Sequence, residues 1–194
     1  MNQEDNVEDT AAIIQRILSG DNRAFERVIN DHQRLVNHIV YRMVSNPGDR
    51  EDVCQDIFMK VYQNLVGFRL DSKLSTWIAR IAYNRCIDYL NKNRVPVIDE
   101  EFDEAIAEIT DESATPEKKL MEANLSSLLQ EEINHLSVQF RTIVTLYHLD
   151  ELSYAEIGDV MSIPEGTVKN YLFRARKLLR ERLTAKYTEE EFRP

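Results

Sequence analysis

The sequence has few of the residues that mark β-rich, secreted or nucleotide-binding proteins. It contains five glycines and five prolines among 194 residues, which favours an all-α fold. The glycines never approach the spacing of a phosphate-binding loop. Cys54 and Cys86 form no CxxC pair, so we expect buried free thiols. The acidic N-terminus is unlike a secretion signal and no apolar run is long enough to span a membrane, so we expect a cytoplasmic protein.

Residues that could bind a metal are also sparse. His32 and His38 have no carboxylate or cysteine at a metal-ligand spacing, and we expect them to be surface or packed side chains. Glu132 and His135 have the ExxH spacing of di-iron helical bundles, but the second copy that such sites need is missing. We therefore expect no metal site, no cofactor and no enzymatic activity.

The stretch from 152 to 183 has the pattern of two helices joined by a tight turn. Ser153 precedes Glu156 by three residues, the spacing of a capping box, so a helix should begin near Tyr154. Pro164 follows that helix and suits the first turn of the next. The first helix should pack through Ala155, Ile157, Gly158, Val160 and Met161. The second has one apolar stripe, formed by Val168, Leu172, Ala175, Leu179 and Leu183. This pattern is typical of a helix-turn-helix DNA-binding motif.

The second of these helices is basic within an acidic protein. Residues 164–182 hold six basic and two acidic side chains, a net charge of +4, whereas the whole chain has −10. A solvated amphipathic helix would explain the charge alone, but the capped first helix and the proline turn favour phosphate contact. Because such helices enter the major groove by their N-terminal turns, residues 165–174 should read bases, and Lys177 and Arg180 should contact the DNA backbone.

Negative charge is concentrated in the middle of the chain. Residues 95–121 carry nine acidic and two basic side chains, and helical periodicity fades there. We predict a flexible acidic linker between two domains. When extended it would reach about 90 Å, enough to hold the domains about two turns of DNA apart. The predicted parts are an N-terminal segment at 1–19, a first domain at 20–94, the linker at 95–121, a second domain at 122–185 and a tail at 186–194.

The first part of the chain should form amphipathic helices. We expect residues 1–9 to be frayed and 11–18 to form a short helix. Asp21 is placed to cap a long core helix, which should end at 46–48. Asp49 is placed to cap the next helix, whose buried stripe would be Val53, Ile57, Val61 and Leu65.

That helix leaves Asp52, Gln55 and Asp56 outside, beside a Phe58 that we expect to be exposed. A docking surface for another protein would have this appearance, but the pattern alone favours a solvated face. A further helix should begin at Ser75.

On the helix that follows Ser75, Trp77, Arg80 and Asn84 share one side. An aromatic ring that stacks, an amide for base edges and a cation for the backbone suit unpaired nucleic acid. A lone tryptophan more often anchors a core, so both interpretations stay open for Trp77. Asn84 is more informative, because asparagine in a mid-helix position lowers helix propensity.

Two blocks of the chain together resemble one family. They are residues 48–92, GDREDVCQDIFMKVYQNLVGFRLDSKLSTWIARIAYNRCIDYLNK, and residues 152–183, LSYAEIGDVMSIPEGTVKNYLFRARKLLRERL. In this order, with an acidic linker between them, they resemble the bacterial sigma factors of the extracytoplasmic function group over about residues 20 to 185. The resemblance implies an all-α fold with a sigma region 2 helical bundle and a sigma region 4 helix-turn-helix. It also implies binding to core RNA polymerase and promoter-specific initiation of transcription.

The resemblance assigns roles to three groups of residues. The polymerase group, which matches the segment that docks on the clamp helices of the largest polymerase subunit, is Asp52, Gln55 and Asp56, and this reverses the preference for a solvated face. The −10 group, which matches the loop and helix that open and read the −10 element, is Phe68, Arg69, Leu70, Asp71, Ser72, Lys73, Trp77, Arg80 and Asn84. The −35 group, which matches the helix that reads the −35 element, is Glu165, Gly166, Thr167, Lys169, Asn170, Phe173, Arg174 and Lys177.

The resemblance also implies partners. These are the RNA polymerase core, promoter DNA and, as for many family members, an anti-sigma factor, with no small-molecule substrate. One departure concerns Asn170 and Tyr171, which stand where the family usually has Ser-Arg, so one expected phosphate contact is missing. The alternative function is a stand-alone operator-binding regulator, which would use only the helix-turn-helix and leave residues 49–94 without a role.

Overall fold

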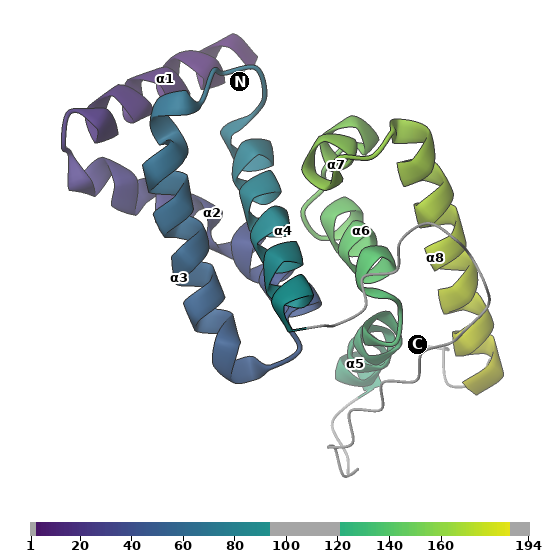
Figure 1. Cartoon of the computed structure of the whole chain (residues 1–194). Helices are drawn as coiled ribbons and strands as arrows, with labels where there is room; N and C mark the ends of the chain where they lie inside the picture. Colours follow the sequence, from purple (N-terminus) through teal and green to yellow (C-terminus); the bar gives the residue numbers. More distant parts are fainter. Residues whose placement is uncertain (1–2, 94–120, 187–194) are drawn as a thin grey trace.

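The computed structural model describes residues 3–93 and 121–186, and every regular element in them is helical (Figure 1). A first helical group contains α1 (Gln3–Leu18), α2 (Asn22–Met43), α3 (Pro47–Asn64), the short 3₁₀ turn η1 (Leu65–Gly67) and α4 (Leu74–Lys92). A second helical group contains α5 (Met121–Asn134), α6 (Val138–His148), α7 (Tyr154–Met161) and α8 (Glu165–Lys186). The predicted all-α fold in two groups is therefore confirmed.

The linker predicted at 95–121 lies outside the described residues, apart from Met121 at the start of α5. The predicted tail also lies outside them, apart from Lys186 at the end of α8. None of the described helices combines the length and apolar character that crossing a membrane requires.

Two predicted helix caps, those of α2 and α7, are confirmed, and α6 has a third cap that also consists of a local hydrogen bond. The Asp21 carboxylate accepts from the backbone N–H groups of the first turn of α2, at 3.0 and 3.2 Å. The Ser137 hydroxyl accepts from the N–H of Phe140 at the start of α6. At α7 the capping box is complete: Ser153 Oγ accepts from the N–H of Glu156 at 3.3 Å, and Glu156 Oε2 accepts from the N–H of Ser153 at 2.8 Å.

Three helix starts differ from the prediction. α1 begins at Gln3 rather than at residue 11. α3 is capped by Asn46, whose Oδ1 accepts from the N–H of Gly48 at 3.0 Å, and not by Asp49. The reason is Pro47, which breaks the preceding helix but fits the first position of α3. α4 begins at Leu74, one residue before Ser75.

α4 lies at the centre of the molecule, with α2 and α3 on one side and α7 on another (Figure 1). One apolar stripe of α4, formed by Ile78, Ala82, Cys86 and Leu90, is buried. A second stripe, which the periodicity did not predict, is also buried and consists of Thr76, Ala79 and Tyr83. Burial of this second stripe follows from packing between the two helical groups.

The apolar stripe of α8 forms the core of the second helical group. Val168, Leu172, Ala175 and Leu179 are buried as predicted, and Leu183 is partly buried. Tyr171 is buried as well, with its ring edge-to-face against Phe140 at 5.5 Å between centroids. This position therefore contributes to the core and not to a phosphate contact.

The turn between α7 and α8 depends on a close backbone approach. A Cβ atom at Gly158 would lie 2.8 Å from the carbonyl oxygen of Ile163. Ser162 ends α7 in the left-handed conformation, with φ of 58°. Ala155, which was expected to pack inward, is exposed. Glycine at 158 is what lets the second helix of the motif cross so near the first.

Candidate functional site

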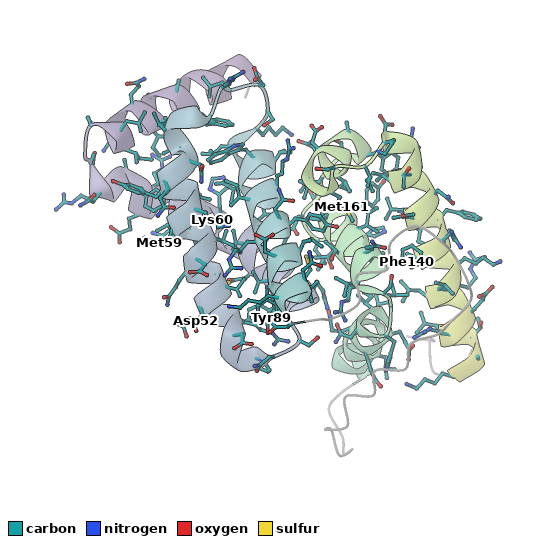
Figure 2. The ribbon with its side chains drawn as sticks, in the orientation of Figure 1. Asp52, Met59, Lys60, Tyr89, Phe140 and Met161 are labelled. Atoms are coloured by element: carbon teal, nitrogen blue, oxygen red, sulfur yellow. The ribbon has the colours of Figure 1, made fainter. Side chains whose placement is uncertain are left out.

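The polymerase group lies on α3, but its three members differ in their surroundings. Asp52 and Gln55 are exposed, and Figure 2 shows Asp52 on the outer side of the helix. The Asp56 carboxylate instead lies 2.6 Å from the Arg85 guanidinium of α4. Phe58, which was expected to be exposed, is half-buried against the core, and Met59 is the exposed apolar residue at 59%. Phe58 packs inward because it lies beside the buried stripe of α3, whereas Met59 lies beyond it.

The loop of the −10 group joins η1 to α4 and is mostly open to solvent. Arg69, Leu70 and Asp71 are exposed. Leu70 has a φ of 61°, a left-handed backbone conformation that costs a residue with a Cβ about 1–2 kcal/mol. The ring of Phe68 packs on that of Trp77, with centroids 5.1 Å apart. A strained, exposed loop backed by an aromatic pair is suited to holding an unstacked base.

The helical part of the −10 group lies along one side of α4. Arg80 and Asn84 are exposed, whereas Trp77 is partly buried and packs against the core. Trp77 therefore anchors the helix, as one of the two interpretations predicted, while part of its ring faces the loop through Phe68.

Most of the −35 group lies on one exposed face of α8, whereas Thr167 and Arg174 are partly buried. Phe173 is 68% exposed, and Lys169 and Asn170 are exposed one turn before it. The Lys169 ammonium lies 2.7 Å from Glu165 Oε1, and this carboxylate raises the pKa of Lys169. Arg176 points elsewhere: its guanidinium carbon lies over the Tyr147 ring of α6, 5.1 Å from the ring centroid, which is the geometry of a cation–π pair. The exposed surface of α8 therefore includes most of the residues of the −35 group.

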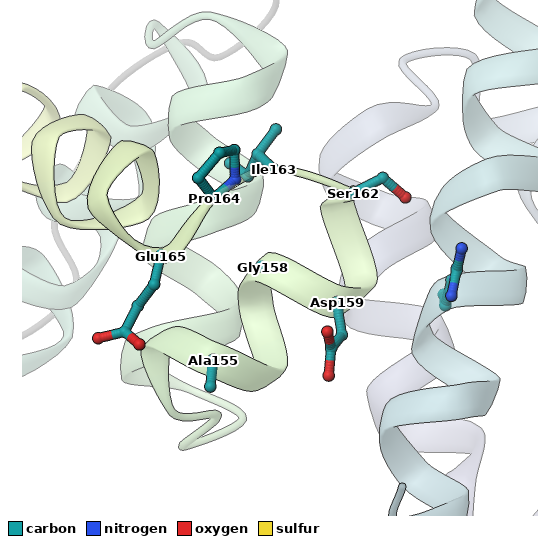
Figure 3. A pocket seen from close by; sticks show the side chains of 8 residues that line it. Ala155, Gly158, Asp159, Ser162, Ile163, Pro164 and Glu165 are labelled. Carbon is teal, nitrogen blue, oxygen red and sulfur yellow. The ribbon is translucent and has the colours of Figure 1, made fainter. Parts of the chain in front are cut away.

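A shallow hollow of about 570 Å³ lies between α4 and the helix-turn-helix (Figure 3). One residue of the −10 group and one of the −35 group both line it. Its walls are Arg80 from α4 and Ala155, Gly158, Asp159, Ser162, Ile163, Pro164 and Glu165 from the motif. The hollow therefore brings together residues that the sequence assigned to separate DNA-contacting surfaces.

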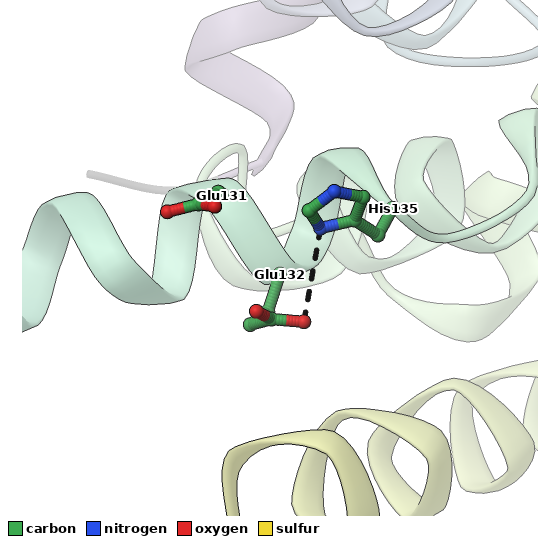
Figure 4. A group of neighbouring side chains, drawn as sticks. All are labelled: Glu131, Glu132 and His135. Atoms are coloured by element: carbon green, nitrogen blue, oxygen red, sulfur yellow. Dashed lines mark ion pairs between the residues drawn. The ribbon is translucent and has the colours of Figure 1, made fainter. Parts of the chain in front are cut away.

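One group of possible metal ligands occurs among the described residues, and it includes the ExxH pair. Glu131, Glu132 and His135 lie close together on α5, with His135 Nδ1 3.8 Å from Glu132 Oε2 (Figure 4). The ammonium of Lys186 lies 3.0 Å from Glu132 Oε1 and 3.3 Å from Glu131 Oε1. A lysine thus already neutralises these carboxylates and ties α5 to the end of α8.

Polar contacts that the sequence did not predict join α2 to the second helical group. Arg42 donates to Thr145 Oγ1 at 3.1 Å, to Asn134 Oδ1 at 2.9 Å and to Gln130 Oε1 at 2.8 Å. All three nitrogens of its guanidinium therefore have partners across the interface. No local pattern could indicate this contact, because the partners lie 88 to 103 residues away in the chain.

A histidine and a buried aspartate form a second contact of this kind. His38 Nδ1 lies 2.7 Å from Asp150 Oδ1, and the Asp150 side chain is 4% exposed. Burial raises the pKa of Asp150, although the hydrogen bond from His38 and the charges of His38 and Arg34 act in the opposite direction. His38 is thus packed, as expected, but it has a carboxylate partner from far along the chain.

Both helical groups match known family models. The model described as Sigma-70 region 2 matches residues 28–95, and the model described as Sigma-70, region 4 matches residues 126–179. The ECF RNA polymerase sigma factor SigW of Bacillus subtilis (strain 168) is 33% identical over 176 residues, which cover 88% of this chain and 94% of the relative. The ECF RNA polymerase sigma-E factor of Escherichia coli (strain K12) is 35% identical over 175 residues, with coverage of 86% and 90%.

Solved structures share the fold. CnrH, in complex with the cytosolic domain of CnrY, superposes with a TM-score of 0.62 at 20% identity, over 91% of this chain and 97% of that one. The sigma factor RpoE from Bartonella quintana, in complex with the anti-sigma factor NepR, has a TM-score of 0.62 at 22% identity, over 84% and 98%. At these identities the likeness is one of fold.

Proposed function

The chain belongs to the extracytoplasmic function group of RNA polymerase sigma factors, and on that premise we propose how its surfaces divide the work. It binds core RNA polymerase and directs transcription from particular promoters. The observation that carries this function is the ordered match of two region models to the two helical groups. A stand-alone operator-binding regulator would need only the second group, so the match over α2–α4 favours the sigma factor.

The proposed polymerase contact is the outer face of α3. Asp52 and Gln55 would bind the clamp helices of the largest polymerase subunit, and the exposed Met59 adds an apolar contact on the same helix. Asp56 serves this surface indirectly, because its pair with Arg85 fixes α3 against α4. The exposed carboxylate of Asp52 forms no ion pair with another described residue, so it is available to a basic partner at little desolvation cost.

The proposed −10 contact is the loop between η1 and α4, together with the exposed residues of α4. The left-handed Leu70 and its neighbours would receive a base that leaves the stack as the DNA opens. Arg80 and Asn84 offer a cation and an amide for the adjoining strand. The proposed −35 contact is the exposed face of α8, where Lys169, Asn170 and Phe173 would enter the major groove.

The polymerase supplies the phosphodiester chemistry, and we propose no catalytic role, cofactor or small-molecule substrate for this chain. Because its partner is the polymerase, we place its action in the cytoplasm. An anti-sigma factor is a further proposed partner, since RpoE of the same fold is bound by NepR. The division into a first domain at 20–94 and a second at 122–185 is retained, and the matched spans of 28–95 and 126–179 support it.

Binding to the core enzyme tests this function and its proposed surface together. Purified chain and core bacterial RNA polymerase are mixed and separated by size-exclusion chromatography, with wild type beside Asp52→Ala/Gln55→Ala. We expect one-to-one co-elution of the wild type and a weaker complex of the double variant. Asp31→Ala is the matched control. Asp31 is an exposed acidic residue of α2, and its ion pair among the described residues is with Arg27 of the same helix. Failure of the wild type to co-elute, with salt-sensitive DNA binding by the chain alone, would favour the operator-binding regulator.

A further inference from the structure

Two tyrosines form a stack beside the exposed face of α8. Tyr147 comes from the end of α6, and Tyr154 is the first residue of α7. Their rings are nearly parallel, with an interplanar angle of 16° and centroids 5.1 Å apart. The capping box at Ser153 fixes the residue before Tyr154, so the backbone that carries this ring is held in place. We call the two rings the tyrosine stack.

Each ring of the tyrosine stack has a cation from α8 over it. Lys169 Nζ lies 5.5 Å from the ring centroid of Tyr154. The guanidinium carbon of Arg176 lies 5.1 Å from the ring centroid of Tyr147. At these distances the ring quadrupole attracts a cation. The two cations are separated by about two helical turns, so they lie on the same side of α8. That side of the helix therefore contacts the tyrosine stack at two points.

The Arg176 end of this row of contacts is anchored by a third side chain. The Arg176 guanidinium lies 3.2 Å from His148 Nε2. The His148 ring packs edge-on against the Tyr147 ring, with centroids 4.9 Å apart. Partial burial and the charge of Arg176 lower the pKa of His148, so its neutral imidazole can accept a hydrogen bond from the guanidinium. These three side chains hold one another, and the ring of Tyr154 stacks on the assembly they form.

The Lys169 end of the row is open to solvent. The Lys169 side chain is 56% exposed, and its ammonium lies 2.7 Å from Glu165 Oε1, one turn earlier on α8. An exposed ion pair of this kind restrains a lysine only weakly, because water screens the charges and both side chains are flexible. An unrestrained ammonium must therefore lose much conformational freedom when it binds a base edge. Contact with the Tyr154 ring removes part of that freedom before any DNA is bound.

We propose that Tyr154 is a positioning residue for promoter reading, because its ring holds the Lys169 ammonium in the orientation in which it contacts the −35 element. Tyr154 lies outside the −35 group, and this inference rests on the proposed function of Lys169 in that group. The pre-ordered ammonium loses less freedom when it meets the correct base. It also turns less readily to another partner when a wrong base offers no acceptor at that point. The ring therefore contributes to discrimination between −35 elements and not only to affinity.

Nuclear magnetic resonance measures the contact between Lys169 and the ring in the free full-length chain. Reductive methylation with isotope-labelled formaldehyde places labelled methyl groups on the lysine amines and keeps their positive charge. The ring current of Tyr154 should move the Lys169 methyl signal upfield, and Lys169→Arg identifies that signal by its loss. We expect the shift to persist in Tyr154→Phe, which keeps the ring, and to disappear in Tyr154→Leu. A Lys169 signal at the position of solvent-exposed lysines in the wild type would overturn the contact.

Transcription from two templates that differ only in the −35 element measures the positioning role. The holoenzyme is reconstituted with the full-length chain, and the ratio of transcripts from the two templates gives the discrimination. We expect Tyr154→Leu to lower this ratio about two- to fivefold, as for loss of one exposed cation–π contact, and Tyr154→Phe to keep it. Tyr41→Leu is the matched control, because Tyr41 is 57% exposed in the first helical group and has the Arg50 guanidinium 4.8 Å from its ring centroid. Circular dichroism establishes that each variant is folded.

A double-variant cycle separates positioning from a general structural effect. If Tyr154 acts through Lys169, Tyr154→Leu should cause no further loss of discrimination in a chain that already carries Lys169→Ala. Losses that multiply would overturn the proposal. An equal loss in Tyr154→Phe would also overturn it, because the effect would then belong to the hydroxyl and not to the ring. Failure of the proposed function has a different signature: the wild type itself would not discriminate between the templates, while the Lys169 signal in the free chain would still be shifted.

Discussion

Two helices carry the proposed DNA contacts, and the structure treats them differently. On α8 most of the −35 group lies on an open face, where Phe173 is 68% exposed. On α4 the neighbouring residues Thr76 and Ala79 are buried, and Lys73 just before the helix is paired with Glu156. Both helices have the same sequence signal, which is an aromatic residue with cations and amides on one side. Their side chains nevertheless differ in how accessible they are to solvent. Accessibility depends on what packs against the helix, and for α4 that neighbour comes from the other half of the chain.

The open face of α8 should give the largest effects. We expect Lys169→Ala and Arg174→Ala each to weaken discrimination between a cognate and an altered −35 element by about 1–3 kcal/mol, the range for a lost base contact. The measurement is transcription by the reconstituted holoenzyme from two templates, one with the cognate −35 element and one with the altered element. Arg180→Ala, two to three turns further along α8, should instead weaken all templates alike and lower the salt dependence. Equal losses on both templates for Lys169→Ala would contradict the assignment.

Gly158→Ala should disrupt the turn between α7 and α8. The new Cβ would lie 2.8 Å from the Ile163 carbonyl oxygen, so the turn between α7 and α8 must shift. We expect a loss of about 1–3 kcal/mol in the free energy of unfolding, as for other overpacked sites. Gly166→Ala is the control, since nothing lies within 4 Å of its Cβ position and alanine is the better helix former. Urea unfolding of both variants separates the steric effect at Gly158 from the general effect of replacing a helical glycine by alanine.

Ser153→Ala should destabilise the start of α7, because it removes the serine cap. The variant keeps Glu156, whose carboxylate pairs with Lys73. Loss of a serine cap costs about 1 kcal/mol. Urea unfolding measures this loss of stability. The control is Ser45→Ala, because Ser45 is an exposed serine of the loop before α3. If the Ser153 variant unfolds like the control, the cap does not stabilise the second group.

Asp150→Asn should have the smallest effect and should change mainly with pH. Because the pKa of Asp150 is raised in the folded chain, its contribution to stability is fully present below its ordinary pKa and is lost as pH rises through the raised value. The stability of the wild type relative to the asparagine variant should therefore increase as the solution is made more acidic, starting from neutral pH. Unfolding curves at several pH values measure the difference. A difference independent of pH would show that the ionisation of Asp150 is not linked to folding.

Local signals explain which features could be predicted from the sequence. The Ser153 and Glu156 capping box, and the buried stripe from Val168 to Leu179, depend on neighbours within four residues, and both are confirmed. The spacing of apolar residues likewise predicted the inner side of α3. It wrongly placed Phe58 on the exposed side, because a residue at the edge of the buried stripe has the same helical spacing whether it is partly buried or exposed.

Long-range contacts explain what could not be predicted. Burial of Thr76 and Tyr83 depends on packing against the second helical group, and the partners of Arg42 lie far along the chain. The pairing of Asp56 with Arg85 has the same origin, since an ion pair between two adjacent helices leaves no periodic signal in the sequence. The residues proposed for contact could thus be named from sequence, whereas their exposure in the free chain could not be predicted.

Run-off transcription tests the central claim most directly. Core RNA polymerase is incubated with a library of genomic fragments, with and without the purified chain, and the 5′ ends of the transcripts are sequenced. We expect new start sites that appear only with the chain and share two sequence elements upstream, and Lys169→Ala should lower their use. An unchanged set of transcripts, at concentrations of chain that saturate binding to the core enzyme, would contradict the assignment of this protein as a promoter-selecting sigma factor.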